Sequence, residues 1–459
     1  MNPGPDDFWF LPLGGCGEIG MNLNLYGHDG CWLMVDCGIT FERLGGSMQI
    51  QTPDPVFIAA RRERLCGLFI THAHEDHLGA VGRLWPQLKC PVDTTRFTAE
   101  ILRRKLMDAG LADVVPLHIV ASGDSQVLGP FKVEWVNLTH STPQSQALVI
   151  GCTAGKVFHT GDWKLDSAPV VGARYPQRRY TALADESILA MVCDSTNAMV
   201  EGHSTTEGEL YSGLYRAVAE ARGRVVVACF GSNVARLQTL LQVAGATQRR
   251  AALLGRSLNN YFCAARAAGL WDPQLRLIES SHLGYLPRGE VMAIATGSQG
   301  EKGAALDRLA AGSHPDMVLE AGDSVILSSR VIPGNEEAVA SLVRRLRELG
   351  VMVVQDGDGT EPLHASGHPC QDELAQMYRW VQPRIAIPVH GEPDHMAANA
   401  QLARAVGVPR QIVGRNGDLF MLAPVPGIRR GAAPAGRLLA GTGRANPTRA
   451  RRHAGPDGS

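Results

Sequence analysis

The sequence predicts an α/β protein in which a strand-rich region is interrupted by a module of alternating strands and helices. Three observations predict this class. Up to about residue 190 the chain shows short strands with turns between them, whereas strands and helices alternate over 205–350. Such alternation is typical of βαβ units and a parallel sheet. In addition, a histidine or an aspartate follows several predicted strands, which places polar side chains at one edge of a sheet.

Length and composition indicate a large globular chain without strong overall charge. The chain has 459 residues, of which 45% are hydrophobic and 19% are charged, and its formal net charge is −1. These values exclude a disordered protein and a globally basic nucleic-acid binder, but not a local basic groove. The ten cysteines form no C-x-x-C pair, the N-terminus lacks the basic region of a signal peptide, and no apolar run reaches the ~18 residues of a membrane span. We therefore expect reduced thiols and a cytoplasmic location.

The first region is predicted to consist mainly of strands. Short apolar or alternating runs bounded by turn residues indicate strands. The clearest runs span 32–35, 65–70, 131–138, 148–150, 156–158 and 189–193. The runs at 148–150 and 156–158 are predicted to pair as a hairpin.

The alternating module is predicted to span residues 205–350. Apolar residues at helical spacing predict helices over 206–222, 233–243, 302–310 and 336–349, and buried runs predict strands over 224–230, 251–254, 291–295, 324–327 and 351–354. A helix at 372–380 and a strand at 384–389 follow. We expect four segments: 1–204 as the first part of one domain, 205–350 as an inserted domain, 351–425 as the part that completes the first domain, and 426–459 as a tail. The tail has seven arginines against one aspartate, and its Gly, Ala and Pro content predicts disorder.

A cluster of histidines directly follows the strand at 65–70. The segment is Thr71-His72-Ala73-His74-Glu75-Asp76-His77. On a loop at a strand end, His72 and His74 can point at one ion, and Asp76 and His77 can point at a second. Imidazole and carboxylate suit zinc. The alternative is a polar loop with coincidental histidines, which three histidines and an aspartate within six residues make improbable.

Three further candidate ligands also follow predicted strands, namely His140, Asp162 and His390. Taken singly, each could be a capping or turn residue. Together with the histidine cluster they predict a dinuclear site: His72, His74 and His140 would hold one metal, Asp76, His77 and His390 would hold the other, and Asp162 would bridge them. Two ions roughly 3.5–4 Å apart can activate a shared water and stabilise both oxygens of an in-line displacement at phosphorus.

These residues resemble those of the metallo-β-lactamase superfamily, and the inserted module resembles its β-CASP branch, whose members cleave nucleic acids. Closer still, the chain is similar to the bacterial ribonuclease J family from about Leu11 to Leu422. The stretches that carry the similarity are Gly17-Glu18-Ile19-Gly20, Gly161-Asp162-Trp163-Lys164, Cys193-Asp194-Ser195-Thr196-Asn197-Ala198, Gly231-Ser232-Asn233, Ala295-Thr296-Gly297-Ser298-Gln299-Gly300-Glu301, Ile332-Pro333-Gly334-Asn335-Glu336, His364-Ala365-Ser366-Gly367-His368 and Pro388-Val389-His390-Gly391-Glu392.

The resemblance implies a fold, an activity and cofactors. The fold would be an αββα sandwich with an inserted α/β β-CASP domain. The activity would be that of a zinc-dependent ribonuclease with two Zn²⁺ per chain, or Mn²⁺ in their place. Its substrate would be single-stranded, 5′-monophosphorylated RNA, which it would degrade as a 5′-to-3′ exonuclease and also cleave internally during RNA processing and decay.

The resemblance also implies roles for particular residues. His364, Ser366 and His368 would hold the scissile phosphate, with His368 stabilising the transition state or protonating the leaving oxygen. Gly231, Ser232 and Asn233 would help to form the 5′-monophosphate pocket. Asp194 would orient or share a proton with a neighbouring histidine, and Asp76 and His77 would be essential for catalysis. The alternatives are a helix cap at or near Ser366, an ordinary strand-to-helix turn capped by Asn233, and a strand-end cap at Asp194.

Two departures from the family pattern accompany the resemblance. Gln144 stands where an acidic residue is usual, and we expect it to alter the surroundings of the ligands rather than to bind metal. The familiar members also carry a C-terminal domain of roughly a hundred residues, so we expect a short form of the family, with a homodimer as a candidate assembly.

Two alternative functions would use the same metal site, and a third would not require it to be active. A nuclease acting on single-stranded DNA, or a hydrolase of a small ester, would use the same ligands. The module at 205–350 disfavours the ester hydrolase, which needs no phosphate pocket. A scaffold protein with vestigial activity is disfavoured by the complete set of ligands.

Overall fold

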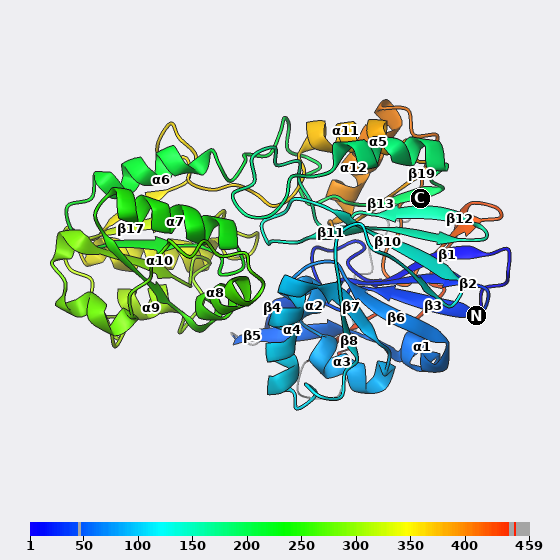
Figure 1. The fold of residues 1–459 in the computed structure, drawn as a ribbon, viewed down its shortest axis with the longest axis horizontal. Helices are drawn as coiled ribbons and strands as arrows, with labels where there is room; N and C mark the ends of the chain where they lie inside the picture. The colour runs from blue at the N-terminus through cyan, green and yellow to red at the C-terminus, as the bar shows by residue number, and fades with distance from the viewer. Residues whose placement is uncertain (45–46, 440–444, 447–459) are drawn as a thin grey trace, which may run out of the picture.

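The protein consists of a two-sheet sandwich and a smaller α/β lobe beside it (Figure 1). The computed structural model describes residues 1–44, 47–439 and 445–446. The first sheet of the sandwich has the order β22 (Gly427–Arg429), β21 (Leu419–Ala423), β1 (Phe8–Gly14), β2 (Leu23–His28), β3 (Cys31–Val35), β6 (Leu65–Ile70), β7 (Val92–Thr95) and β8 (Leu117–Val120). The N-terminal strand β1 thus lies between β2 and the late strand β21.

The second sheet faces the first. Its order is β20 (Arg410–Gln411), β19 (Ile385–Val389), β13 (Ala190–Asp194), β12 (Gly155–His159), β11 (Gln146–Cys152), β10 (Phe131–Asn137) and β9 (Ser125–Leu128). Large buried side chains from both sheets, among them Phe10, Tyr26, Phe69 and Trp135, form the core between them. Burial of this apolar area is the main force that holds the two sheets together.

Helices cover the outer face of each sheet. The first sheet carries α1 (Val56–Ala59), α3 (Val81–Leu88) and α4 (Arg96–Asp108). The second carries α5 (Gln177–Ala182), α11 (Gln371–Val381) and α12 (Pro393–Ala405). The layers therefore run helix, sheet, sheet, helix, which confirms the expected αββα sandwich.

The smaller lobe is a five-stranded parallel sheet with helices on both faces, which confirms the predicted α/β insertion. Its order is β15 (Arg250–Leu254), β16 (Val291–Ala295), β14 (Val225–Ala228), β17 (Ser324–Leu327) and β18 (Met352–Gln355). Apolar residues fill the central strands, as expected for strands covered on both faces. One face carries α6 (Leu210–Ala219), α7 (Val234–Ala246) and α8 (Arg256–Ala267), and the other carries α9 (Ala305–Ala310) and α10 (Glu336–Glu348).

The lobe is seated on the sandwich through helix α8. Tyr261 and Ala264 of α8 join the apolar cluster that contains Phe97 and Ile101 of α4. The Tyr261 hydroxyl donates a hydrogen bond of 2.9 Å to the backbone oxygen of Ala73, inside the predicted metal-binding segment. The inserted lobe therefore lies directly over the histidine cluster.

Three differences from the sequence-based expectation concern the inserted domain and the tail. The strand β18 pairs with β17, so the inserted domain extends past residue 350 to about residue 355. The helix α8 was not predicted, because its polar residues obscure the apolar spacing. The third difference concerns the tail.

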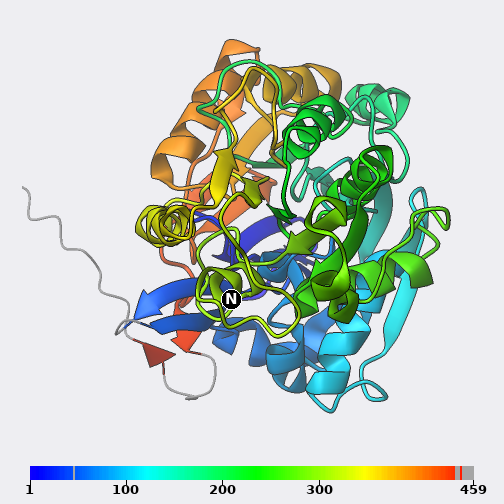
Figure 2. The ribbon, with the colours of Figure 1, turned by 90° about the vertical axis from the view of Figure 1, so that its left-hand side faces the viewer.

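The predicted disorder of the tail is wrong for residues 427–429 and 437–439. The strand β22 extends the first sheet, and β23 (Arg437–Leu439) pairs with β5 (Ser47–Pro53). With β4 (Thr40–Leu44) and β24 (Ala445–Asn446) these strands form a small separate sheet, whose blue and red strands lie side by side in Figure 2. The prediction for 440–444 and 447–459 falls outside the described residues.

Across the described parts of the chain, none of the helices combines the length and the apolar character needed to cross a lipid bilayer.

Candidate metal centre and active site

The predicted ligands come from loops at the ends of strands in both sheets. The segment from Thr71 to His77 follows β6 and leads into α2 (Glu75–Leu78). Asp162 and His390 follow β12 and β19, which with β13 form a parallel run in the second sheet. Because the carboxyl ends of parallel strands meet at one edge, residues far apart in sequence converge there.

One group of ligand atoms comprises His72, His74, His140 and Asp162, and all of its ligand atoms lie within 4.8 Å of one another. The Nδ1 atom of His74 lies 3.1 Å from Nε2 of His72 and 3.1 Å from Nε2 of His140. The Asp162 Oδ2 atom lies 3.8 Å and 3.9 Å from these two Nε2 atoms. This is the first metal site that the sequence predicts.

A second group shares Asp162 and adds Asp76, His77 and His390. The His77 Nε2 atom lies 3.2 Å from Asp162 Oδ2, and His390 Nε2 lies 3.1 Å from Asp76 Oδ2. Asp162 belongs to both groups, which is the arrangement expected of a bridging carboxylate. The structure therefore brings all seven predicted ligands together in two adjoining groups.

The charges of the two groups differ. Burial lowers the pKa of His72 and His140 well below the usual value and lowers that of His74 to about 4, so these imidazoles are neutral. Burial also acts to lower the pKa of His77 and of His390, but neighbouring carboxylates, Asp162 foremost, outweigh it and raise both pKa values. Without metal, the raised pKa values favour protonation of these two imidazoles, and a divalent ion would displace the protons.

The residues present fit a pair of divalent ions. Neutral imidazole is the form that binds a metal, and the three histidines of the first group direct ring nitrogens at one another at close range. The Oδ1 atom of Asp162 is buried and makes no hydrogen bond. A buried carboxylate oxygen without a donor is costly unless a ligand meets it. Nitrogen and oxygen donors of this kind suit zinc or manganese.

Neighbouring residues fix the orientation of several ligand rings. Asp36, directly after β3, accepts a 2.7 Å hydrogen bond from Nδ1 of His77 and also binds the backbone N–H and the hydroxyl of Thr71. The Thr71 hydroxyl contacts Nδ1 of His72 at 3.0 Å, and Nδ1 of His140 donates a 2.6 Å bond to the Gly367 oxygen. Such partners fix the tautomer of a metal-binding histidine. Sequence reasoning missed Asp36, whose one signal was its position after a buried strand.

Asp194 and His368 form a pair beside the metal groups. The Nδ1 atom of His368 lies 2.7 Å from Asp194 Oδ2 and 4.0 Å from Asp162 Oδ2. Burial would lower the pKa of His368, but the Asp194 carboxylate overrides it and raises that pKa. Asp194 also accepts a 2.7 Å bond from Thr196, which contacts Nδ1 of His390. The expected contact between Asp194 and a histidine is therefore present, and it orients His368.

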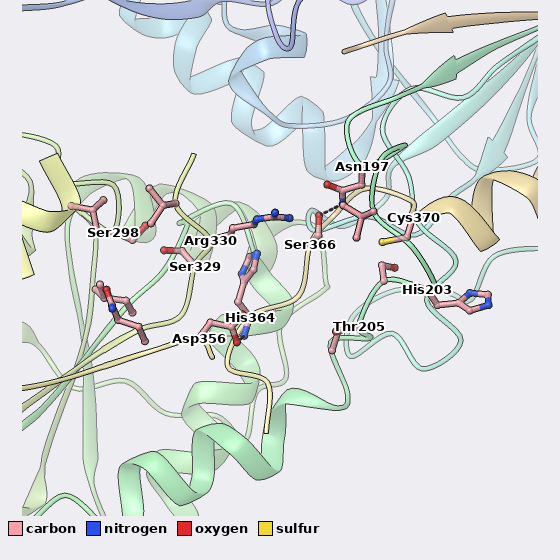
Figure 3. Close-up of a pocket in the computed structure, with 16 residues that line it drawn as sticks. Asn197, His203, Thr205, Ser298, Ser329, Arg330, Asp356, His364, Ser366 and Cys370 are labelled. Atoms are coloured by element: carbon pink, nitrogen blue, oxygen red, sulfur yellow. Dashed lines mark hydrogen bonds between the residues drawn. The ribbon is translucent and has the colours of Figure 1, made fainter. Parts of the chain in front are cut away.

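His364 and Ser366 line a cavity of about 570 Å³ between the two lobes. Figure 3 shows His364 and Arg330 on one side, with Arg330 extending toward Ser366. Ser366 accepts a 2.8 Å bond from Asn197 and is not a helix cap, because α11 is capped by Cys370. The Nδ1 atom of His364 is buried without a partner. The cavity thus has a mixed lining, in which aliphatic side chains such as Leu327 and Val339 lie beside polar ones. The Arg330 side chain has no ion pair among the described residues.

The turn Gly231-Ser232-Asn233 lies between β14 and α7, at the interface of the lobes. Asn233 caps α7 by accepting a 2.9 Å bond from the Arg236 N–H, and its amide donates a 2.8 Å bond to Glu207. Its side chain therefore serves the fold, as the alternative interpretation holds. The Ser232 hydroxyl lies 3.1 Å from Nε2 of His74.

Gln144 stands near the N-terminus of α4 and not among the ligands. Its Oε1 atom accepts a 2.9 Å bond from the backbone N–H of Phe97 in the first turn of that helix. An uncharged side chain at this position thus still satisfies a helix-end donor. Among the described residues, no hydrogen bond joins its side chain to the candidate ligands.

Family models match three parts of the chain. Residues 21–185 match the metallo-β-lactamase superfamily, residues 222–346 match the ribonuclease J β-CASP domain, and residues 359–413 match the Zn-dependent metallo-hydrolase RNA specificity domain. The β-CASP match falls within the smaller lobe.

Curated relatives match almost the whole chain. A ribonuclease J of Sinorhizobium meliloti is 42% identical over 439 residues, which are 94% of this chain and 77% of that protein. A ribonuclease J of Mycolicibacterium smegmatis is 37% identical over 435 residues, or 93% of this chain and 77% of that protein. The crystal structure of a protein of unknown function from Enterococcus faecalis V583 matches the fold with a TM-score of 0.63 at 14% identity, covering 90% of this chain and 100% of that one.

Proposed function

The chain belongs to the ribonuclease J family and is a metal-dependent ribonuclease, and from this premise we propose that it degrades single-stranded RNA from a 5′-monophosphorylated end, in the 5′-to-3′ direction. Internal cleavage is a second mode of the same site. The observation that carries the proposal is that the two groups of candidate ligands adjoin the His368–Asp194 pair. Ser366, two residues before His368, lines a cavity between the lobes.

We propose two Zn²⁺ ions as the cofactors, one held by His72, His74 and His140 and the other by Asp76, His77 and His390, with Asp162 between them. When bound, the ions activate water and stabilise the charge that develops on the phosphate. Mn²⁺ suits the same donors. Metal analysis of the purified protein distinguishes the two.

The pair of His368 and Asp194 supplies the proton that the reaction needs. Leaving-group departure from a phosphodiester produces an alkoxide that must be protonated. The Asp194 carboxylate raises the pKa of His368 and so favours the protonated imidazole. We assign to His368 the protonation of the leaving oxygen, and to Asp194 the orientation of that ring.

The cavity beside His364 and Ser366 is the proposed place for the 5′-phosphate. Arg330 offers a guanidinium that has no ion pair among the described residues, and Ser366 offers a hydroxyl. A guanidinium with a hydroxyl beside it is a common binding arrangement for phosphate. The turn at 231–233 does not line this cavity, and it would offer backbone N–H groups to the RNA rather than the Asn233 side chain.

The remaining expectations are proposals on the same premise. The cytoplasm is where a ribonuclease with ten free cysteines would work. A homodimer is a candidate assembly, and sedimentation of the purified chain measures it directly.

The decisive experiment compares one labelled RNA with a 5′-monophosphate, a 5′-triphosphate or a 5′-hydroxyl, together with single-stranded DNA of the same sequence. We expect mononucleotides from the 5′ end, fastest with the monophosphate. The variant Asp76→Ala/His77→Ala should be inactive on all of them. Arg330→Ala should keep its metals but lose the preference for the monophosphate. Equal rates on all three RNA ends would refute 5′-end recognition, and faster DNA cleavage would favour the DNA nuclease.

A further inference from the structure

Ser232 of the inserted lobe contacts a ligand of the metal centre in the sandwich. Its hydroxyl lies 3.1 Å from Nε2 of His74. The opposite ring nitrogen of His74, Nδ1, faces His72 and His140 at 3.1 Å each. His74 therefore presents Nδ1 to the first metal site, and Ser232 forms a hydrogen bond with its other ring nitrogen, Nε2.

The other rings of this region have orienting partners from the sandwich itself. Thr71 contacts His72, Asp36 contacts His77, and the Gly367 oxygen contacts His140. Among these histidines, His74 is the one whose partner comes from the inserted lobe. The contact completes a pattern in which each imidazole is fixed at the nitrogen that faces away from the metal.

The turn that carries Ser232 is held rigidly. Asn233 caps α7, and its amide is bound to Glu207. Glu207 in turn forms a buried ion pair with Arg236, with 3.1 Å between Oε1 and Nη2. The backbone N–H of Glu207 donates a 3.0 Å bond to Asp166, four residues beyond the bridging Asp162. Ser232 is thus tied to the same loop that supplies the bridge.

We propose that Ser232 is a positioning residue that orients His74, so that the seating of the inserted lobe controls metal binding at the site formed by His72, His74 and His140. In this arrangement Nε2–H of His74 donates to the Ser232 oxygen, and the Ser232 O–H stays available to a phosphate. The inference rests on the proposed function only in requiring that these residues bind a metal.

The test measures metal binding by the full-length protein and does not depend on activity. Replacement of Ser232→Ala removes the hydroxyl, Ser232→Thr retains it, and Ser257→Ala is the matched control, since Ser257 is an exposed serine beside the same turn. Zn²⁺ affinity is determined by competition with a chromogenic chelator. Co²⁺ absorption reports the ligand geometry, and melting of the metal-free protein reports stability.

We expect Ser232→Ala to weaken one of two Zn²⁺ equivalents by roughly 10- to 100-fold, the usual effect of removing such a partner. The other equivalent and the melting temperature of the metal-free protein should not change. The Co²⁺ spectrum should shift in Ser232→Ala and be restored in Ser232→Thr, with Ser257→Ala like wild type.

Three outcomes would overturn the inference. Unchanged Zn²⁺ affinity and Co²⁺ spectrum in Ser232→Ala would overturn it alone and leave the proposed function standing. A loss of affinity that Ser232→Thr does not relieve, with a lower melting temperature of the metal-free protein, would show a folding role instead. A wild-type chain that bound no metal would overturn both the inference and the proposed function.

Discussion

The buried ion pair between Glu207 and Arg236 offers a quantitative test of how the two lobes are joined. Both side chains are almost fully buried, with 3% and 1% of their area exposed. Arg236 also donates to the backbone oxygen and the hydroxyl of Ser328. The variant Glu207→Gln keeps the volume of the side chain, removes the charge that balances Arg236 and turns an amide donor toward a guanidinium.

Leaving one charge of a buried pair uncompensated costs about 3–5 kcal/mol, which for a cooperative unit of about 150 residues lowers the melting temperature by about 6–20 °C. The matched control is Glu361→Gln, because Glu361 pairs with Arg216 at the surface, where the exposed fractions are 29% and 57%. An exposed pair of this kind contributes about 0–1 kcal/mol.

Thermal unfolding followed by circular dichroism, with limited proteolysis of the inserted lobe, measures both effects on the full chain. We expect the lobe of Glu207→Gln to become sensitive to protease well below the main transition. If Glu207→Gln melts within 2 °C of Glu361→Gln, the ion pair between Glu207 and Arg236 does not stabilise the inserted lobe. In that case it does not fix the turn that carries Ser232 either.

Further predictions concern the metal loop and pH. The variant Asp36→Asn should weaken Zn²⁺ binding at the His77 site roughly 10- to 100-fold, as measured by chelator competition, and wild-type affinity would contradict the orienting role of Asp36. The variant Gly38→Ala should lose metal and soluble yield, because a Cβ there would lie 1.6 Å from the Asp76 backbone oxygen; a well-folded, metal-replete variant would show that the loop can move. Dialysis against a chelator should abolish RNA cleavage, and added Zn²⁺ or Mn²⁺ should restore it. The added metal should also raise the melting temperature, because a ligand at a hundred times its Kd increases the free energy of unfolding by about 2.7 kcal/mol. Burial acts to raise the pKa of Glu207, but the Arg236 guanidinium outweighs it and lowers that pKa, so the charge of Glu207 stabilises the fold above its ordinary pKa of 4.5 and this contribution is lost in stronger acid. The difference in stability between wild type and Glu207→Gln should therefore shrink as the pH falls below 4.5, and a constant difference down to pH 3 would contradict the assignment.

Four of the seven candidate ligands could be predicted from sequence because their pattern is local. His72, His74, Asp76 and His77 lie within six residues after a buried strand, and few structures other than a metal site require that density of imidazole. His390 was harder, since alone it resembles a turn residue, and the resemblance to a family assigned it.

Other features could not be predicted because they exist only through tertiary contacts. Asp36 looks like any polar residue after a strand until β3 and β6 pair and place it against His77. The contact of Ser232 with His74 depends on how one lobe sits on the other. The end of the inserted domain was misplaced because a strand such as β18 does not reveal in its own residues which sheet it joins.

The prediction of a disordered tail was wrong in part for a similar reason. Arginines among glycines and alanines favour disorder, yet Arg437 pairs with Glu18 beside the metal loops, and β23 adds to the edge of β5. Partners elsewhere in the chain, which local composition does not report, order these residues.

Strands that neighbour one another in the sheets lie far apart in the sequence, and this has a consequence during protein synthesis. His390 lies 314 positions after Asp76 in the sequence, and β1 gains its second neighbour only when β21 has been synthesised. A growing polypeptide that has not yet produced β19 lacks one ligand of the second metal site and an outer part of the sheet that frames it. The second group of candidate ligands is therefore complete only after β19 has been synthesised.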